Sequence, residues 1–174
     1  MVFEKIRKAD REEYLAMEHD FYHSPAVLHP IPDENHKLTF DVLMEGSPYT
    51  VCFMFRSDDK KEVYGFALLA LTYSNEAGGI VVWLEEIYVK PEHRCKGITG
   101  EFFKFIEKEY ADVARIRLET EPDNERAVRL YERNGFTKLG YSQMYISKFG
   151  TMSTVSFSMS VSSSTAILLM RASV

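Results

Sequence analysis

Cysteine is scarce in this chain of 174 residues, which holds only Cys52 and Cys95. Two isolated cysteines exclude both a disulfide framework and a zinc knuckle, because each of these needs several cysteines at short, regular spacing. This composition favours a reducing compartment. His19 and His23 are four residues apart, but no third candidate ligand accompanies them, and we therefore expect no metal site.

Long apolar runs and an excess of basic residues are also missing. No apolar stretch reaches the roughly 20 residues that a membrane-spanning helix needs, and residues 1–5 lack the charged-then-apolar layout of a signal peptide. The net charge of −5 argues against a broad nucleic-acid-binding surface. We therefore expect a cytoplasmic protein whose partners include neither nucleic acid nor a membrane.

What is present is an ordinary globular composition with alternating strand-like and helix-like patterns. The content of 45% hydrophobic and 27% charged residues suits one domain with a substantial core. Apolar periodicity predicts strands at 3–7, 50–56, 62–73, 80–89 and 115–121, and helices at 11–22, 33–45, 101–110 and 125–133. This order indicates an α+β fold with helices packed on a largely antiparallel sheet.

Two helix starts carry specific expectations. Asp10 is predicted to cap the first helix while Glu13 reaches back in a capping box. Asp33 is predicted to cap the second helix, which has Leu38 and Val42 on one side.

The predicted domain covers residues 1–149, and a serine-rich tail follows at 150–174. The alternation in residues 155–161 is typical of a strand. Three interpretations of the tail stay open, namely an added hairpin on the sheet edge, a contact in a homodimer, and an extension unrelated to the fold.

The segment from Leu84 to Gly100 is the centre of the functional argument. A strand ends at Pro91, and a basic loop with two glycines leads into the next helix. Free N–H groups and the positive dipole end at a helix N-terminus favour an anion such as a phosphate. The spacing matches neither the Walker phosphate loop nor the dinucleotide fingerprint.

The pattern that fits is Arg94-x-x-Gly97-x-Thr99, which resembles the acetyl-CoA-binding motif of the GNAT superfamily of N-acetyltransferases. Thr99 departs from the glycine or alanine that is usual there. A second run, Asn124-x-x-Ala127-x-x-Leu130-Tyr131 with Gly135-Phe136, is similar to the second GNAT signature at every named position. The resemblance covers about residues 3 to 149. It implies three α/β/α layers around a mixed, largely antiparallel sheet with helices on both faces.

The resemblance also implies how acetyl-CoA would bind. Backbone groups of Ile87, Tyr88 and Val89 would pair with the pantetheine arm, and Asn124 and Tyr131 would contact the cofactor. The pyrophosphate would be held by the N–H groups of Arg94, Cys95, Lys96, Gly97, Ile98, Thr99 and Gly100. Cys95 is interpreted as a tolerated residue of this loop and not as a nucleophile.

Three candidate catalytic residues follow. Tyr131 corresponds to the family's general acid, which protonates the departing thiolate. Glu85 and Glu86 should lie on opposite strand faces, and one of them would relay the proton of the amine. We favour Glu85 from the resemblance. The alternative is that both carboxylates attract a cationic substrate or pair with nearby arginines, Arg115 or Arg117.

The sequence therefore predicts an N-acetyltransferase that transfers an acetyl group from acetyl-CoA to a primary amine by direct transfer in a ternary complex. A small cationic, polyamine- or lysine-like acceptor is favoured, and a peptide or protein amine stays open. The rival functions are a non-catalytic CoA-binding sensor and an interaction protein that assembles through its tail.

Overall fold

The computed structural model describes residues 1–24, 27, 29–121, 123–141 and 144. The chain divides into two units, Met1–Lys138 and Leu139–Val174, and the described strands and helices belong to the first. The predicted tail strand at 155–161 and the predicted domain boundary after residue 149 lie outside the described residues.

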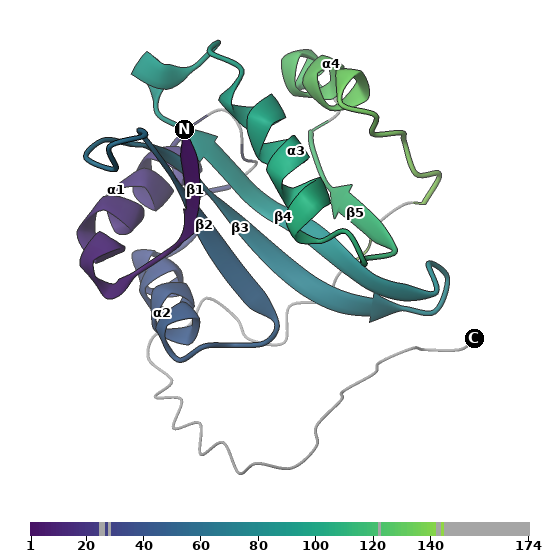
Figure 1. Cartoon of the computed structure of the whole chain (residues 1–174), viewed down its shortest axis with the longest axis horizontal. Helices are drawn as coiled ribbons and strands as arrows, with labels where there is room; N and C mark the ends of the chain where they lie inside the picture. The colour runs from purple at the N-terminus through teal and green to yellow at the C-terminus, as the bar shows by residue number, and fades with distance from the viewer. Residues whose placement is uncertain (25–26, 28, 122, 142–143, 145–174) are drawn as a thin grey trace. The chain divides into compact units, whose positions relative to one another are not determined.

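A five-stranded sheet forms the centre of the first unit, in the order β1-β2-β3-β4-β5 (Figure 1). The first four strands pair antiparallel, and β5 pairs parallel with β4, so the sheet is mixed and largely antiparallel as predicted. The strands are β1 (Val2–Lys5), β2 (Thr50–Arg56), β3 (Val63–Ser74), β4 (Gly79–Val89) and β5 (Arg115–Leu118).

Helices cover both faces of this sheet. Helices α1 (Arg11–Tyr22) and α2 (Asp33–Met44) lie on one face, and α3 (Ile98–Glu109) and α4 (Glu125–Arg133) lie on the other (Figure 1). Short 3-10 turns at Lys8–Asp10 and Pro91–His93 precede α1 and follow β4. The predicted three-layer α+β architecture is confirmed, and none of the described helices is long and apolar enough to cross a membrane.

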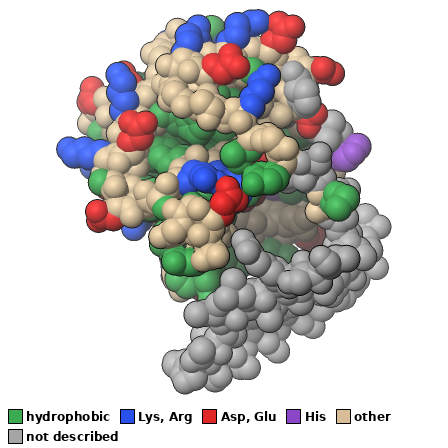
Figure 2. All heavy atoms as spheres, turned by 90° about the vertical axis from the view of Figure 1, so that its right-hand side faces the viewer, with side chains coloured by type: hydrophobic (Ala, Val, Ile, Leu, Met, Phe, Trp, Pro, Cys, Tyr) green, Lys and Arg blue, Asp and Glu red, His purple; other side chains and the backbone are tan. Residues whose placement is uncertain are grey.

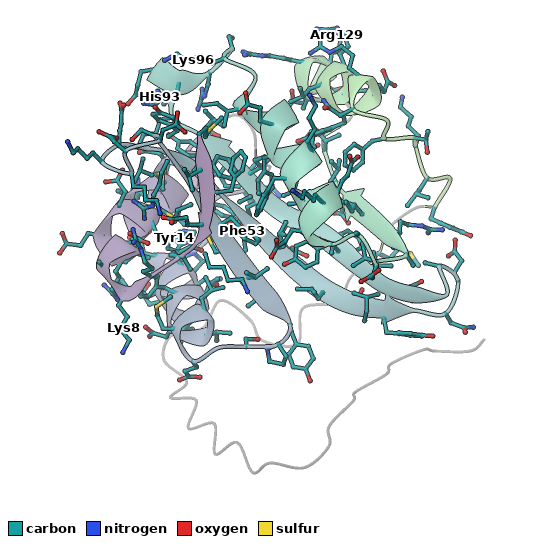
Figure 3. The ribbon with its side chains drawn as sticks, viewed as in Figure 1. Lys8, Tyr14, Phe53, His93, Lys96 and Arg129 are labelled. Carbon is teal, nitrogen blue, oxygen red and sulfur yellow. The ribbon has the colours of Figure 1, made fainter. Side chains whose placement is uncertain are left out.

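Two hydrophobic clusters separate because side chains alternate along each strand. Phe53 on β2 belongs to the cluster under α3, which includes Phe102 and Ile106. Its neighbour Met54 belongs to the cluster under α1 and α2, with Tyr14. Figure 3 labels Phe53 and Tyr14, one from each cluster. Each face of the sheet therefore has its own core.

The helix starts correct two sequence predictions. The capping box at α1 is absent, because the Asp10 carboxylate accepts the Arg7 N–H at 2.8 Å and pairs with the buried Arg56 guanidinium. Glu13 instead forms an ion pair with Lys90. Asp33 is the first residue of α2, and Pro32 occupies the cap position.

The predicted apolar side of α2 faces solvent. Leu38 is 57% exposed and Val42 37% exposed, whereas His36 and Phe40 are buried. Both pairs have the i,i+4 spacing of one helix face. The pair that packs against the sheet is the one that contains the aromatic ring of Phe40.

Charges of both signs are interspersed on the face drawn in Figure 2, where acidic and basic side chains alternate around apolar ones. The net charge of −5 is therefore not gathered into one patch on this face.

Candidate active site

A groove of about 1230 Å³ runs between β4, the loop before α3, the end of β5 and α4. All but one of the site residues predicted from the sequence line it: Glu85, Glu86, Ile87, Tyr88, Val89, Arg94, Cys95, Gly97, Ile98, Thr99, Gly100, Asn124 and Tyr131. The structure thus brings together two motifs that are distant in the sequence.

The groove opens where β4 leaves β5. Leu68 of β3 pairs with Glu86, and the next residue, Leu69, pairs with Leu84, so Glu85 is the extra residue of a β-bulge. The parallel pairing of β4 with β5 ends at Leu84 and Leu118. A bulge bends its strand, and this is why β5 is shorter than the predicted 115–121. Beyond the bulge, β4 has no ladder partner on the β5 side among the described residues.

The loop before α3 has the backbone of an anion site. Gly97, the cap residue of α3, has φ of +80°, and Cys95 has φ of +63°. These left-handed residues turn the chain into α3, whose first residues, Ile98, Thr99 and Gly100, line the groove. The N–H groups at a helix start have no helical acceptor and suit an anion. The Arg94 Nε–H donates to the Val89 carbonyl at 2.8 Å, which fixes the loop against the end of β4.

Lys96 is the predicted residue that does not line the groove. Its Nζ lies 3.4 Å from Nδ1 of His93, and Figure 3 shows the two labelled side chains close together at the same end of the domain. His93 is buried, and its Nε2 lies 3.1 Å from Glu62. The Lys96 ammonium is thus directed at His93, which itself lines the groove.

Three arginines of α4 line the groove and were missed by the sequence reasoning: Arg126, Arg129 and Arg133. Their i, i+3, i+7 spacing puts them on one helix face, a signal that the sequence carries. Arg126 contacts the Cys95 sulfur at 3.0 Å and Arg129 pairs with Glu125 at 2.8 Å. The groove therefore has a basic wall on α4, and Figure 3 labels Arg129 on this helix.

The two adjacent glutamates occupy different surroundings. The Glu85 side chain keeps much of its surface exposed to solvent. The burial of the remainder, together with the charges of Glu86 and Glu119, raises the pKa of its carboxyl. Glu86 is half-buried and accepts the Tyr22 hydroxyl at 2.6 Å. The bulge interrupts the simple alternation on which the predicted opposite-face arrangement rests.

The arginines that were considered as partners of these glutamates have other contacts. Arg115 pairs with Glu76 at 3.4 Å. The guanidinium of Arg117 lies over the Trp83 ring at 4.2 Å.

Tyr131 and Asn124 are positioned by α4. Asn124 caps the helix by accepting the Ala127 N–H at 3.1 Å. The Tyr131 ring lies 5.9 Å from Phe103. Burial raises the pKa of the Tyr131 phenol, so the hydroxyl keeps its proton at neutral pH and is chemically able to act as an acid.

The model of the acetyltransferase (GNAT) family matches residues 6–136 of the chain. A curated relative, the thialysine N-epsilon-acetyltransferase of Bos taurus, is 36% identical over 75 residues. That alignment covers 42% of this chain and 44% of the relative, so it spans less than half of either protein.

Solved structures share the fold at low sequence identity. A possible acetyltransferase from Clostridium difficile 630 is 17% identical with a TM-score of 0.74, over 86% of this chain and 98% of the other. The aminoglycoside acetyltransferase AAC(6')-Iy, in complex with a bisubstrate analogue of CoA and acetylneamine, is 18% identical with a TM-score of 0.69, over 85% and 98%.

Proposed function

From the premise that this chain is an N-acetyltransferase of the GNAT family, we propose that it transfers the acetyl group of acetyl-CoA to the primary amine of a small cationic molecule. The observation that carries the proposal is the opening of β4 away from β5 beside the N-terminus of α3. This opening supplies a free strand edge and an anion site within one groove.

The groove has a suitable place for each part of acetyl-CoA. The strand edge from Ile87 to Val89 offers backbone donors and acceptors to the amide groups of the pantetheine arm, as an added strand would. The first N–H groups of α3 suit the pyrophosphate. The basic wall on α4 adds positive charge for the phosphates.

The chemistry needs one group that accepts a proton and one that donates a proton. An alkyl ammonium must lose a proton before its nitrogen attacks the acetyl carbon, and Glu86 or Glu85 receives that proton directly or through water. As the new C–N bond forms and the C–S bond breaks, the Tyr131 hydroxyl donates its proton to the sulfur that leaves.

Carboxylates at the groove support a cationic acceptor. Glu119, Glu121 and Asp123 line it in addition to the two β4 glutamates, and negative charge concentrates ammonium ions. Thialysine and an aminoglycoside derivative are named for the relatives above, and both are amines. We therefore propose a polyamine- or lysine-like acceptor ahead of a peptide amine.

The experiment is a thiol-release assay with acetyl-CoA against amines, polyamines, amino acids and peptides, with CoA affinity measured by calorimetry on the same samples. Tyr131→Phe should lower kcat by about 100-fold, the scale of general acid catalysis, and should leave CoA affinity unchanged. Tyr110→Phe is the matched control, because Tyr110 is also partly buried but lies at the end of α3 and outside the groove. Tight CoA binding with no turnover of any amine would instead favour the sensor function.

A further inference from the structure

A buried polar cluster lies behind Glu86, on the sheet face that α1 and α2 cover. Glu18 of α1 is 1% exposed, Tyr14 0% and His36 of α2 4%. Glu86 is the link between this cluster and the groove, because it lines the groove and also accepts the Tyr22 hydroxyl. None of the buried members was anticipated as a site residue.

Two carboxylate oxygens in this cluster lack a donor. Tyr22 satisfies Oε1 of Glu86, but Oε2 of Glu86 and Oε2 of Glu18 are buried and have no hydrogen-bond partner among the described residues. Two ionised carboxylates next to each other in a buried site repel, and each unpaired oxygen adds a desolvation cost. One proton held between the two side chains removes the repulsion and gives both oxygens a partner.

His36 does not supply that proton. Its Nδ1 lies 3.5 Å from Oε2 of Glu18, too far for a strong hydrogen bond. Burial is the main cause that lowers the pKa of His36, so its imidazole is neutral at pH 7.

The proton belongs on Glu18. Burial first, then the charge of Glu86, raise the pKa of Glu18 to about 9, although the neighbouring Tyr14 acts in the opposite direction. Glu86 is the less buried member and faces the groove, where its charge is better solvated.

We propose that Glu18 is a neutral, buried carboxylic acid that donates a hydrogen bond to the ionised Glu86 carboxylate and so positions Glu86, rather than Glu85, as the acceptor of the ammonium proton. This inference rests on the proposed function. Glu18 is a positioning residue, because it acts only through Glu86. In the transfer, the proton moves from the ammonium nitrogen to Glu86, and Glu18 keeps its own proton.

The phenols and the thiol packed around the pair keep their protons up to pH 10. Burial raises the pKa values of Tyr14 and Tyr22 from α1 and of Cys52 from β2. On β4, Glu85 is the nearest acid to Glu86. On α1 and α2, the charges of Glu86 and Asp33 raise the pKa of His36, and His19 and His23 lower it. A titration between pH 8 and pH 10 within this cluster therefore reports Glu18.

The first test compares two substitutions of Glu18. Glu18→Gln keeps the volume and an N–H donor and cannot ionise, so kcat at pH 7 should stay within about 3-fold of the wild type. Glu18→Leu removes the donor and should lower kcat about 10- to 100-fold, the range for a hydrogen bond to a charged group. The KM for acetyl-CoA should be unchanged in both, because Glu18 does not line the groove.

The pH profile separates positioning from simple structural damage. Without the donor, the charged form of Glu86 is less stable, so the acidic limb of kcat/KM should move to higher pH by about 1 unit in Glu18→Leu and stay in place in Glu18→Gln. An unmoved limb in a folded Glu18→Leu variant would overturn the inference. If Glu18→Leu does not fold, a loss of kcat in Glu18→Gln as large as that in Glu86→Gln would overturn the inference as well.

The closing experiment is a ¹³C NMR titration of the glutamate side-chain carboxyls in the free protein, which needs no substrate. We expect one carboxyl that titrates near pH 9, that is absent in Glu18→Gln and that persists in Tyr131→Phe. An ionised Glu18 beside a protonated His36 at pH 7 in an active enzyme overturns this inference alone. A neutral Glu18 in a protein that acetylates no amine overturns the role of Glu86 together with the proposed function.

Discussion

Gly65 of β3 is the residue on which the close approach of β3 and β4 depends. A Cβ atom at this position would lie 2.0 Å from the Tyr88 carbonyl oxygen and 3.0 Å from the Val89 Cα, both of which are backbone atoms. Gly65 pairs with Val89, in the part of β4 that we propose for the pantetheine arm. Only a residue without a side chain allows this contact.

Gly65→Ala should therefore force the two strands apart. We expect a loss of about 3 kcal/mol in the free energy of unfolding, at the upper end of the cost of overpacking, together with weaker CoA binding. Chemical denaturation and calorimetry measure the two effects. Gly140→Ala is the control, because a Cβ there meets nothing within 4 Å. Equal stabilities of the two variants would contradict the assigned contact.

The protonation of Glu18 has a consequence for stability. Its carboxyl has an ordinary pKa of 4.5 and a folded-state pKa of about 9, so between these values the folded protein holds a proton that the unfolded chain has released. Stability from this group is complete below pH 4.5 and is lost as the pH rises towards 9, at up to about 1.4 kcal/mol per pH unit.

Glu18→Gln should remove this dependence. Denaturation at pH 5, 7 and 9 should show that the variant gains stability relative to the wild type as the pH rises. A constant difference between the two proteins over this range would mean that Glu18 is ionised in both states.

The sequence predicted the motif residues of the site because the chemistry of each depends on its local neighbours. Gly97 turns a loop, and Asn124 caps a helix within three residues. Glu18 and Glu86 could not be paired in this way. Their contact joins a helix to a strand 68 positions later in the chain, and polar residues on an amphipathic helix ordinarily face water.

At the scale of single elements, α4 has the bounds that its sequence predicted, because Asn124 starts the helix and Gly135, with φ of +87°, follows its end. The interior side of α2 was predicted wrongly. The sequence of α2 offers two stripes, Leu38 with Val42 and His36 with Phe40, and only the first is wholly apolar. Which stripe is buried depends on the complementary surface of the sheet, which no local pattern contains.

The basic wall of α4 leads to a prediction for cofactor affinity. Arg126→Gln and Arg133→Gln should each weaken CoA binding about 3- to 10-fold, the effect of about 1 kcal/mol for one exposed charge contact, and the loss should shrink at high salt. Calorimetry at two salt concentrations measures both effects. Arg115→Gln is the matched control, because Arg115 pairs with Glu76 and does not line the groove. An equal loss in the control would mean that only the net charge of the protein matters.

At the scale of the whole molecule, the described groove and both cores lie within Met1–Lys138. The family model likewise ends at residue 136. A chain shortened to residues 1–149 should therefore bind CoA with unchanged affinity and should acetylate the same amines. Calorimetry and size-exclusion chromatography test this, and loss of CoA binding or a change from dimer to monomer would show that the serine-rich tail contributes to the site or to assembly.

The overall architecture was predictable because element order and apolar periodicity determine how many strands and helices there are and in which layers they pack. The opening of the groove was not predictable from these patterns. It depends on the bulge at Glu85 in the pairing of β3 with β4, directly after the last residue of β4 that pairs with β5. The apolar run that enters β4 gives no sign of that irregularity.

The most direct test of the account is acetyl-CoA turnover by the wild type and by Tyr131→Phe across the amine panel, with CoA affinity measured on the same samples. We predict acetylation of a cationic amine class by the wild type, a loss of about 100-fold in Tyr131→Phe, and equal CoA affinity in the two proteins. Failure of the wild type to bind CoA would contradict the anion site at α3, and with it the proposed function.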